Sequence, residues 1–223
     1  MLLTDSLDIR PGITAIIGGG GKTTLMERLA AELSAEARVL VCTTTHIFPE
    51  RHMPCLVSPS AQQITDALTQ TRCVCVGSVS ENGKFTAPGL PFPVLSGLAD
   101  YVIVEADGAK RLPLKAHASH EPVIPPGANQ TILVAGLSGF FRPAIQSVHR
   151  AELFAARLGI PVDTAVTPLL WTAFVNQEAL HTRVLLNQAD TAAQLLLAEQ
   201  IAPLLHTPVC AAALQKEMIT CLC

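Results

Sequence analysis

The hydrophobic positions of this chain fall into short continuous runs that alternate with stretches of helical spacing. A strand buried on both faces is hydrophobic at successive positions, whereas an amphipathic helix repeats its apolar residues every three or four positions. The pattern therefore predicts strands at Ile13–Ile17, Val39–Thr43, Cys73–Gly77, Tyr101–Val104, Thr131–Ala135, Val184–Leu186 and Val209–Ala213. It predicts helices at Lys22–Ala37, Ser60–Gln70, Val148–Leu158, Leu169–Phe174 and Thr191–Leu205.

The alternation of strands and helices predicts an α/β fold. Strands that are connected through helices pair in parallel, so we expect a largely parallel sheet between two layers of helices. A proline-rich stretch over 112–127 is expected to be irregular, and Glu81–Lys84 is expected to form a hairpin turn. We expect one domain over 1–223, to which residues 110–128 and 138–180 could add a small inserted lobe.

The composition restricts the classes of function. Hydrophobic residues make up 49% of the 223 positions and charged residues 15%, which excludes a disordered chain. The net charge is −3 and no basic run occurs, so nucleic-acid binding is not expected. A homo-oligomer interface would account for part of the apolar excess.

The hydropathy of the chain bears on its location. The mean hydropathy is +0.40, yet the hydrophobic runs are far shorter than the ~20 residues of a membrane span. The N-terminal segment contains acidic residues and a Pro-Gly pair, unlike a signal peptide. We therefore expect a cytoplasmic protein without a membrane segment.

A glycine-rich loop is the strongest chemical signal in the sequence. It follows the first predicted strand and opens the first predicted helix, and its residues are Gly18, Gly19, Gly20, Gly21, Lys22, Thr23 and Thr24. Successive glycines allow backbone N–H groups to surround an oxyanion, and the helix N-terminus adds a favourable dipole. Lys22 would contact the β- and γ-phosphates of a nucleoside triphosphate, and the Thr23 hydroxyl would ligate Mg²⁺. The spacing predicts a P-loop, with Ile16 where the usual motif has its first glycine.

Two carboxylates follow the predicted strand Tyr101–Val104. Side chains alternate along an extended chain, so Glu105 and Asp107 project to the same side. If this strand neighbours the first one, one acid could bind Mg²⁺ through water and the other could position an attacking water. We therefore assign Lys22, Glu105 and Asp107 to catalysis and Thr23, Glu105 and Asp107 to the metal. Solvated acids at an ordinary strand end are the alternative, and the sequence does not rank the two acids.

Polar residues also follow two other predicted strands. A hydroxyl of the run Thr43–His46 could sense Mg²⁺ or a γ-phosphate, or these residues could simply end the strand. Asn187 and Asp190 form an Asn-x-x-Asp pattern, and an aspartate there could accept hydrogen bonds from guanine that adenine does not offer. Alternatively, the pair forms a turn that caps the helix from Thr191. Gln188 stands in place of the lysine typical of GTPases, so both ATP and GTP remain open.

The loop over 107–125 gathers further charged residues, namely Lys110, Arg111, Lys115, His117, His120 and Glu121. Its basic residues could clamp an anionic substrate, and its histidines with Glu121 could bind a metal or move protons. A structural loop with surface charges would have the same composition. Arg142 and Arg150 are further candidates for stabilising negative charge, and the sequence does not place them.

Several of these segments together resemble the YqeC family. The resemblance rests on Gly18–Thr24, Thr43–His46, Val104–Lys110, Leu114–His117, His120–Pro125 and Asn187–Asp190. It implies a P-loop fold and a role in maturing a selenium- or molybdenum-containing cofactor. The partners that it implies are a molybdenum hydroxylase or the proteins that mature its cofactor.

The residues and the resemblance together predict a Mg²⁺-dependent accessory protein that hydrolyses ATP or GTP. The nucleotide would be bound by Gly18–Thr24 together with Asn187 and Asp190. One alternative is a small-molecule kinase whose acceptor binds the loop over 110–125, so that nucleotide turnover rises with acceptor. Another alternative is a nucleotide-bound scaffold that cleaves nothing.

Overall fold

The computed structural model describes residues 2–46, 53–80, 85–216 and 218–222. Its strands are β1 (Gly12–Gly18), β2 (Val39–Thr43), β3 (Cys55–Val57), β4 (Cys73–Val79), β5 (Phe85–Thr86), β6 (Tyr101–Glu105), β7 (Leu114–Lys115), β8 (Ala128–Gly136), β9 (Val148–His149), β10 (Arg183–Asn187), β11 (Val209–Ala213) and β12 (Met218–Cys221). Its helices are α1 (Leu3–Ser6), α2 (Lys22–Leu33), α3 (Ala61–Thr71), α4 (Phe92–Leu98), α5 (Ala144–Ser147), α6 (Ala151–Leu158), α7 (Pro168–Glu178) and α8 (Ala192–Ile201). Short 3₁₀ turns occur at Leu137–Gly139, Ala202–Leu204 and Leu214–Lys216.

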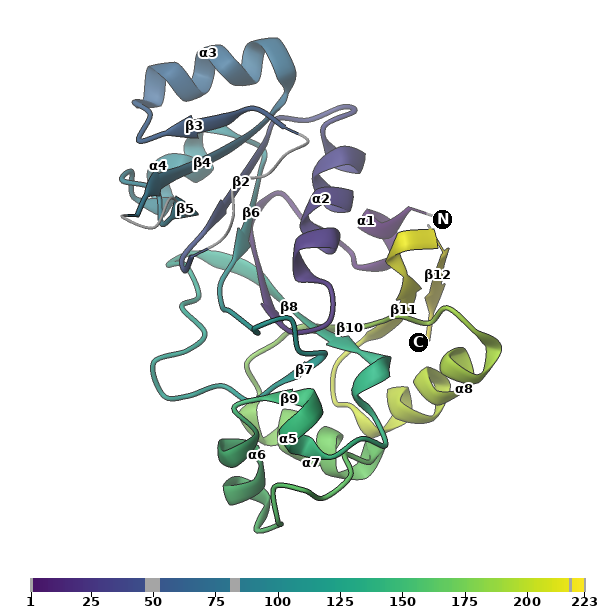
Figure 1. Ribbon diagram of the computed structural model, residues 1–223. Helices are drawn as coiled ribbons and strands as arrows, with labels where there is room; N and C mark the ends of the chain where they lie inside the picture. The colour runs from purple at the N-terminus through teal and green to yellow at the C-terminus, as the bar shows by residue number, and fades with distance from the viewer. Residues whose placement is uncertain (1, 47–52, 81–84, 217, 223) are drawn as a thin grey trace.

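A central sheet runs through the molecule in the order β12-β11-β10-β8-β1-β6-β2-β4-β3, and β5 pairs with β4 (Figure 1). The pairings are parallel except at β11–β12 and β4–β5. Strand β1 lies between β8 and β6, with Ile16 opposite Glu105 and Gly18 opposite Val134. Because these strands are parallel, their carboxyl ends meet at one edge of the sheet, which is where open α/β sheets bind ligands.

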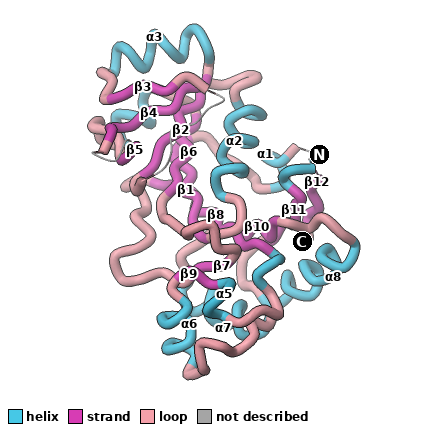
Figure 2. The backbone as a smooth tube through the Cα atoms, viewed as in Figure 1, coloured by secondary structure: helices cyan, strands magenta, loops and turns pink. Residues whose placement is uncertain are grey.

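Helices cover both faces of this sheet (Figures 1 and 2). On one face, Leu25 of α2 belongs to a buried cluster that also includes residues of α1 and of the central strands. On the other face, Ile64 of α3 and Leu95 of α4 pack over β2, β4 and β6. Phe154 and Trp171, from α6 and α7, pack on the same face over β8 and β10. The predicted α/β class, with three layers and a largely parallel sheet, is confirmed.

The structure confirms the seven predicted strands and the five predicted helices, although the ends of four helices differ from the prediction. Helix α7 continues past Phe174 to Glu178, and helix α8 ends at Ile201, where a 3₁₀ turn replaces the predicted end at Leu205. Helix α2 ends at Leu33 instead of Ala37, because residues 34–37 turn and lead to Arg38, whose backbone N–H donates to Asp100. Helix α6 begins at Ala151, since Val148–His149 instead forms β9.

The elements that the hydrophobic pattern did not predict are short. They are α1, α4, α5, β3, β5, β7, β9 and β12, none longer than seven residues. Elements of this length carry too few positions to show a period of 2 or 3.6 residues. The hairpin turn predicted at Glu81–Lys84 lies outside the described residues, and the flanking strands β4 and β5 pair antiparallel.

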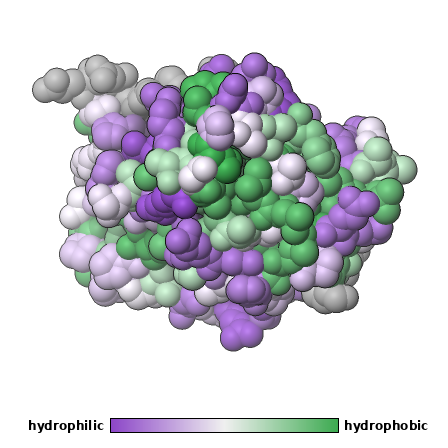
Figure 3. Space-filling view, turned by 90° about the horizontal axis from the view of Figure 1, so that it is seen from below, coloured by the Kyte–Doolittle hydropathy of each residue, from purple (hydrophilic) through white to green (hydrophobic). Residues whose placement is uncertain are grey.

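The segments 110–128 and 138–180 lie together at the lower end of the molecule in Figure 1. Their strands β7 and β9 pair in parallel, and their helices share one buried cluster with β1, β8 and β10. Seen from below, hydrophobic side chains gather between polar ones on this end (Figure 3). Phe141, Ile145 and Leu169 are exposed residues of these segments. Across the described ranges, no helix has both the length and the hydrophobicity that crossing a membrane requires.

Candidate functional site

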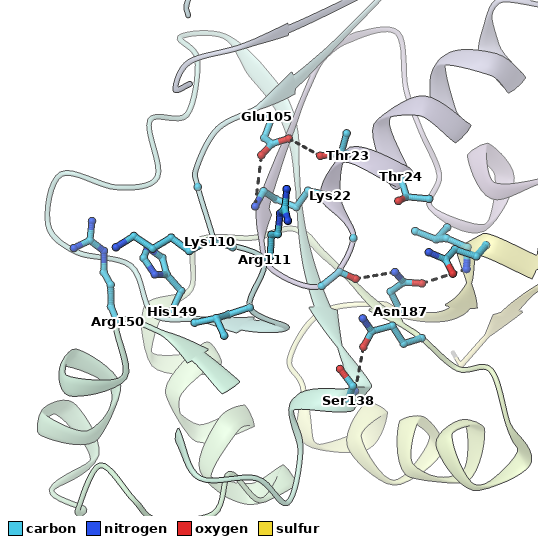
Figure 4. Close-up of a pocket in the computed structure, with 18 of the residues that line it drawn as sticks. Lys22, Thr23, Thr24, Glu105, Lys110, Arg111, Ser138, His149, Arg150 and Asn187 are labelled. Carbon is cyan, nitrogen blue, oxygen red and sulfur yellow. Dashed lines mark hydrogen bonds and ion pairs between the residues drawn. The ribbon is translucent and has the colours of Figure 1, made fainter. Parts of the chain in front are cut away.

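A cleft of about 1100 Å³ opens at the carboxyl edge of the sheet (Figure 4). Its lining comprises residues 20–24, 108–112 and 214–215 together with His46, Glu105, Glu121, Ser138, His149, Arg150, Asn187, Gln188, Asp190 and Gln194. The site residues assigned from the sequence therefore meet here, apart from Gly18, Gly19 and Asp107, which do not line the cleft. A cleft of this volume and position is typical of a small-molecule site.

The glycine loop, Gly18–Gly21, takes a backbone path that glycine permits. Gly18, Gly20 and Gly21 have φ values of 95°, 76° and 130°, which side chains disfavour. A Cβ atom on Gly20 would overlap the backbone of Gly136, and one on Gly21 would overlap the Asn187 side chain. The loop is therefore held closely against the ends of β8 and β10.

The backbone N–H groups near this loop divide into two sets. Gly19 donates to the carbonyl of Val134 at 2.8 Å, and Gly20 donates to that of Leu112 at 3.2 Å. In contrast, the N–H groups of Lys22–Thr24 have no acceptor within the described chain, as expected for the first turn of a helix. The start of α2 thus presents free donors to the cleft.

Lys22 is a buried cation whose position is set by the protein itself. Its side chain is 6% exposed, and its Nζ donates to the Gly18 carbonyl at 2.7 Å. Nζ also lies 3.2 Å from Asp107 Oδ1 and 3.7 Å from Glu105 Oε1. These three contacts hold the ammonium group beside the glycine loop, and Lys22 itself lines the cleft.

Glu105 lies on the cleft side of the glycine loop. Because β6 pairs with β1, its carboxylate comes beside the start of α2, where the Thr23 hydroxyl donates to Oε2 at 3.4 Å. Burial raises the pKa of Glu105, and the nearby Asp107 raises it further, against the opposing effect of Lys22. A hydroxyl and a carboxylate beside the glycine loop are oxygen ligands that suit Mg²⁺.

Asp107 lies on the buried side of the same loop. Its carboxylate is fully buried and accepts hydrogen bonds from the Gly18 N–H and from His117 Nε2, each at 2.8 Å. Burial alone raises the pKa of Asp107, but the His117 hydrogen bond, the charges of Lys22 and Lys115 and the Gly18 N–H outweigh burial and lower it to about 2. Asp107 thus holds Lys22 and the loop from behind and does not face the cleft.

Asn187 ties the end of β10 to the glycine loop. Its Nδ2 donates to the Gly20 carbonyl at 2.7 Å, and its Oδ1 accepts from the Leu214 N–H at 3.2 Å. The residue is buried and also lines the cleft. Asn187 therefore connects the glycine loop with Leu214, which follows β11.

Asp190 lines the same end of the cleft as Asn187. Its carboxylate lies 3.7 Å from Lys216 Nζ, in an exposed position. Helix α8 is capped by Thr191, whose Oγ1 accepts from the Gln194 N–H at 3.3 Å. The cap predicted as an alternative role for this turn is thus made by Thr191, and the Asp190 carboxylate is not used for it.

Comparison with known proteins identifies the family of this chain. The family model described as YqeC protein matches residues 14–152, more than half of the chain. The chain belongs to the YqeC family. An uncharacterized YqeC protein of Escherichia coli strain K12 is 35% identical over 165 residues, which cover 70% of this chain and 64% of the relative. The chain therefore matches a little under two thirds of that relative's length.

The family match covers part of the site of this YqeC-family chain. The glycine loop, Glu105, Asp107 and Arg150 fall within residues 14–152. Asn187 and Asp190 lie beyond the matched residues. The cleft thus combines residues of the matched region with residues from the C-terminal part of the chain.

A chain of buried ion pairs continues from Asp107 away from the cleft. His117 Nδ1 lies 2.8 Å from Glu178 Oε2, and Arg157 donates to Glu178 Oε1 at 3.1 Å. Burial lowers the pKa of His117, but the two carboxylates outweigh burial and raise it. Glu178 and Arg157 were not predicted, because they lie far along the chain in helices without any motif. This connection links the glycine loop to α6 and α7.

The polar run Thr43–His46 bonds mainly to the backbone. The Thr43 hydroxyl donates to the Glu105 carbonyl at 2.9 Å, and the Thr44 hydroxyl donates to the Val123 carbonyl at 2.8 Å. Of this run, His46 alone lines the cleft. The threonine hydroxyls therefore stabilise the edge of the sheet in this structure.

The end of the cleft away from Asn187 is basic. Lys110, His149 and Arg150 line it and lie on the other side of Lys22 from Asn187 (Figure 4). The side chain of Arg111 also lines the cleft, but Figure 4 shows it in line with Lys22 and apart from these three residues. His149 was not predicted, because nothing in its local sequence indicates a site. Among the described residues, the cleft included, no group of three His, Cys, Asp or Glu side chains is arranged around a common metal position.

Proposed function

We propose that this protein binds a nucleoside triphosphate with Mg²⁺ in the cleft and hydrolyses it. The observation that carries the proposal is the placement of Lys22 and the free N–H groups of Lys22–Thr24 beside Glu105 at the carboxyl end of β1. A buried cation and several aligned N–H donors at a helix start suit the β- and γ-phosphates of a nucleotide. The glycine loop would act as a P-loop.

Thr23 and Glu105 would hold the Mg²⁺ ion. In nucleotide sites Mg²⁺ takes most of its ligands from phosphates and water and needs few from the protein, which fits this small set. When bound, the ion neutralises charge on the β- and γ-oxygens. In hydrolysis, water attacks the γ-phosphorus and the bond to the β–γ bridging oxygen breaks, giving a nucleoside diphosphate and phosphate. Lys22 and the α2 N–H groups would stabilise the charge that develops, while Asp107 positions Lys22.

The base would lie near Asn187 and Asp190. A carboxylate there can accept two hydrogen bonds from guanine, from N1–H and the 2-amino group, whereas adenine has an acceptor at N1 and no amino group at C2. Asp190 is not needed as a helix cap, so its carboxylate is available for this contact. We therefore propose a preference for GTP over ATP.

The cellular role that we propose follows the family. As a YqeC-family member, the protein would act in the cytoplasm as an accessory factor in maturing a selenium- or molybdenum-containing cofactor. Its partner would be a molybdenum hydroxylase or a protein that matures the cofactor. Nucleotide binding would order the loops around the cleft, and hydrolysis would release them.

The test is calorimetric titration of the protein with MgATP and MgGTP, with phosphate release measured in parallel. We expect binding in the wild type and its loss, by on the order of 100-fold or more, in Lys22→Ala. Arg38→Ala is a matched control, because it also removes one cation but lies at the opposite end of β2, in an exposed pair with Asp100. Equal affinity in Lys22→Ala and Arg38→Ala would exclude a nucleotide site at this loop.

A second candidate function is transfer of the γ-phosphoryl group to a small molecule. The basic end of the cleft favours it, since an acceptor could bind beside the γ-phosphate there. Phosphate release measured without acceptor would then be very slow, although nucleotide binding would still depend on Lys22. Binding without cleavage under any condition would instead indicate a nucleotide-held scaffold.

A further inference from the structure

The basic end of the cleft is assembled from two segments that lie far apart in the sequence. Lys110 follows β6, whereas Arg150 precedes α6. The parallel pairing of β7 with β9 holds the two segments together, and the Ala116 N–H donates to the His149 carbonyl at 3.0 Å. These cations therefore come from a defined structure, not from one flexible run.

The charge at this end is poorly compensated. Lys110 has an exposed side chain that makes no ion pair or hydrogen bond with the described residues. Glu121, the carboxylate that lines this end, already lies 3.1 Å from Lys115 Nζ and 3.0 Å from Arg150 Nε. One carboxylate thus serves two cations, and Lys110 adds a third positive charge with no carboxylate of its own among the described residues.

The positive field acts on the histidine between these residues. Burial first, and then the charges of Lys115, Arg150 and Lys110, lower the pKa of His149. Glu121 opposes this effect and does not cancel it. A neutral histidine beside three cations leaves the net charge of this end of the cleft positive.

The backbone at Lys110 and Arg150 is also unusual. Lys110 and Arg150 have φ values of 48° and 66°, in the left-handed region. This conformation is strained for a residue that carries a side chain. Strain of this kind gathers at ligand sites, where the structure places particular side chains at that cost. Glycine would satisfy the backbone here, yet cationic side chains occupy both positions.

We propose that Lys110 and Arg150 form a second anion subsite, which binds the phosphate group of a small molecule. A dianionic phosphate would match the uncompensated charge, with the Arg150 guanidinium donating hydrogen bonds and Lys110 acting as a point charge. The placement of this ligand beside the γ-phosphate rests on the proposed function, whereas the subsite itself does not. Inorganic phosphate and a phosphorylated small molecule share this chemistry.

The test is calorimetric titration with inorganic phosphate, and separately with glycerol 2-phosphate, of four proteins. They are the wild type, Lys22→Ala, the double variant Lys110→Ala/Arg150→Ala, and Arg142→Ala. Arg142 is a matched control, because it is an exposed arginine that does not line the cleft. We expect phosphate to bind the wild type, Lys22→Ala and Arg142→Ala alike, and to bind the double variant at least about tenfold more weakly. Tighter binding of glycerol 2-phosphate than of phosphate would identify a phosphorylated small molecule as the ligand, and the reverse would identify free phosphate.

Three results would overturn the subsite. One is the absence of phosphate binding to the wild type. Another is binding that is lost in Lys22→Ala and retained in the double variant, because the phosphate would then lie in the glycine loop. The third is a double variant that weakens MgATP and MgGTP as much as phosphate, which would assign these cations to the nucleotide. Failure of the nucleotide proposal would appear separately, as Lys22-independent nucleotide affinity, and would leave phosphate binding in Lys22→Ala unaffected.

Discussion

Glu105 and Asp107 are two residues apart, yet they lie on opposite sides of the glycine loop and differ in almost every property. Glu105 faces the cleft, and its pKa is raised because burial outweighs its contact with Lys22. Asp107 is fully buried behind the loop, and its pKa is lowered to about 2 because His117, Lys22 and Lys115 surround it. A carboxylate charge is thus stabilised on the buried side of the loop and is poorly stabilised on the cleft side.

This difference indicates what each side of the loop does. A carboxylate with a lowered pKa contributes free energy of folding, since the native state favours its charge. A carboxylate with a raised pKa opposes folding as an anion, and a bound cation would relieve that cost. The buried side of the loop therefore stabilises the architecture, and the cleft side keeps charges whose partners are ligands.

The largest effect is expected for Asp107→Asn. This change leaves Lys22, Lys115 and His117 without the carboxylate that all three contact. Removal of one partner from a buried ionic cluster costs about 3–5 kcal/mol of unfolding free energy. Urea denaturation of the variant and the wild type at pH 7 measures the difference.

The pH dependence gives an independent check on that variant. Asp107 has a folded pKa of about 2, below its ordinary value of 3.8, so its contribution to stability is complete above about pH 4 and is lost as the pH falls toward 2. Its titration accounts for about 2 kcal/mol of the difference between wild type and variant. A difference that stays constant from pH 5 to pH 2.5 would show that Asp107 does not carry this charge.

Glu105→Gln is expected to change nucleotide binding much more than it changes stability, in contrast to Asp107→Asn. Because the fold disfavours the charged form of Glu105, the neutral glutamine should change the unfolding free energy by less than about 1 kcal/mol. The variant should weaken Mg²⁺-dependent nucleotide binding by on the order of 10-fold, since one oxygen ligand loses its charge. Titrations with and without Mg²⁺ separate the two effects, and an equal loss in EDTA would remove Glu105 from the metal site.

Asp190→Ala tests whether the cleft distinguishes GTP from ATP. If the carboxylate binds guanine, the variant loses about tenfold or more in affinity for GTP and little in affinity for ATP. Its stability should change by less than about 0.5 kcal/mol, because the pair with Lys216 is exposed and long at 3.7 Å. Equal losses for the two nucleotides would show that Asp190 does not contact the base.

The sequence predicts the centre of the fold better than its edges, for a physical reason. Strands such as β1 and β6 are buried on both faces, so their hydrophobic runs identify them without any knowledge of neighbours. Strands β3 and β12 lie at the two edges, and their few residues pack on one side or not at all. Val148 was predicted as helical because it is apolar and adjoins a helix, whereas pairing with Leu114 makes it part of a strand.

The candidate site likewise has a part that the sequence predicts and a part that it does not. The glycine loop could be predicted because its geometry arises within one short segment of chain. The separation of Glu105 from Asp107 could not, because their spacing places both on one side of an extended chain, whereas β6 ends at Glu105. His149 joins the other cleft residues through the pairing of β7 with β9. Glu178 reaches His117 through the packing of α7. No local sequence pattern encodes either arrangement.

The smallest effect on the unfolding free energy is expected for substitutions of Lys110, which lines the cleft. Its side chain makes no ion pair or hydrogen bond with the described residues, and its φ of 48° favours glycine. Lys110→Gly should therefore raise the unfolding free energy by up to about 1 kcal/mol, because relief of the strained backbone exceeds the added entropy of the unfolded chain. Lys110→Ala retains the strain and should leave stability within about 0.5 kcal/mol of the wild type. Thermal denaturation of the pair tests this order; if both variants were destabilised alike, Lys110 would be a structural residue, and the contrast between the two sides of the loop would not extend to it.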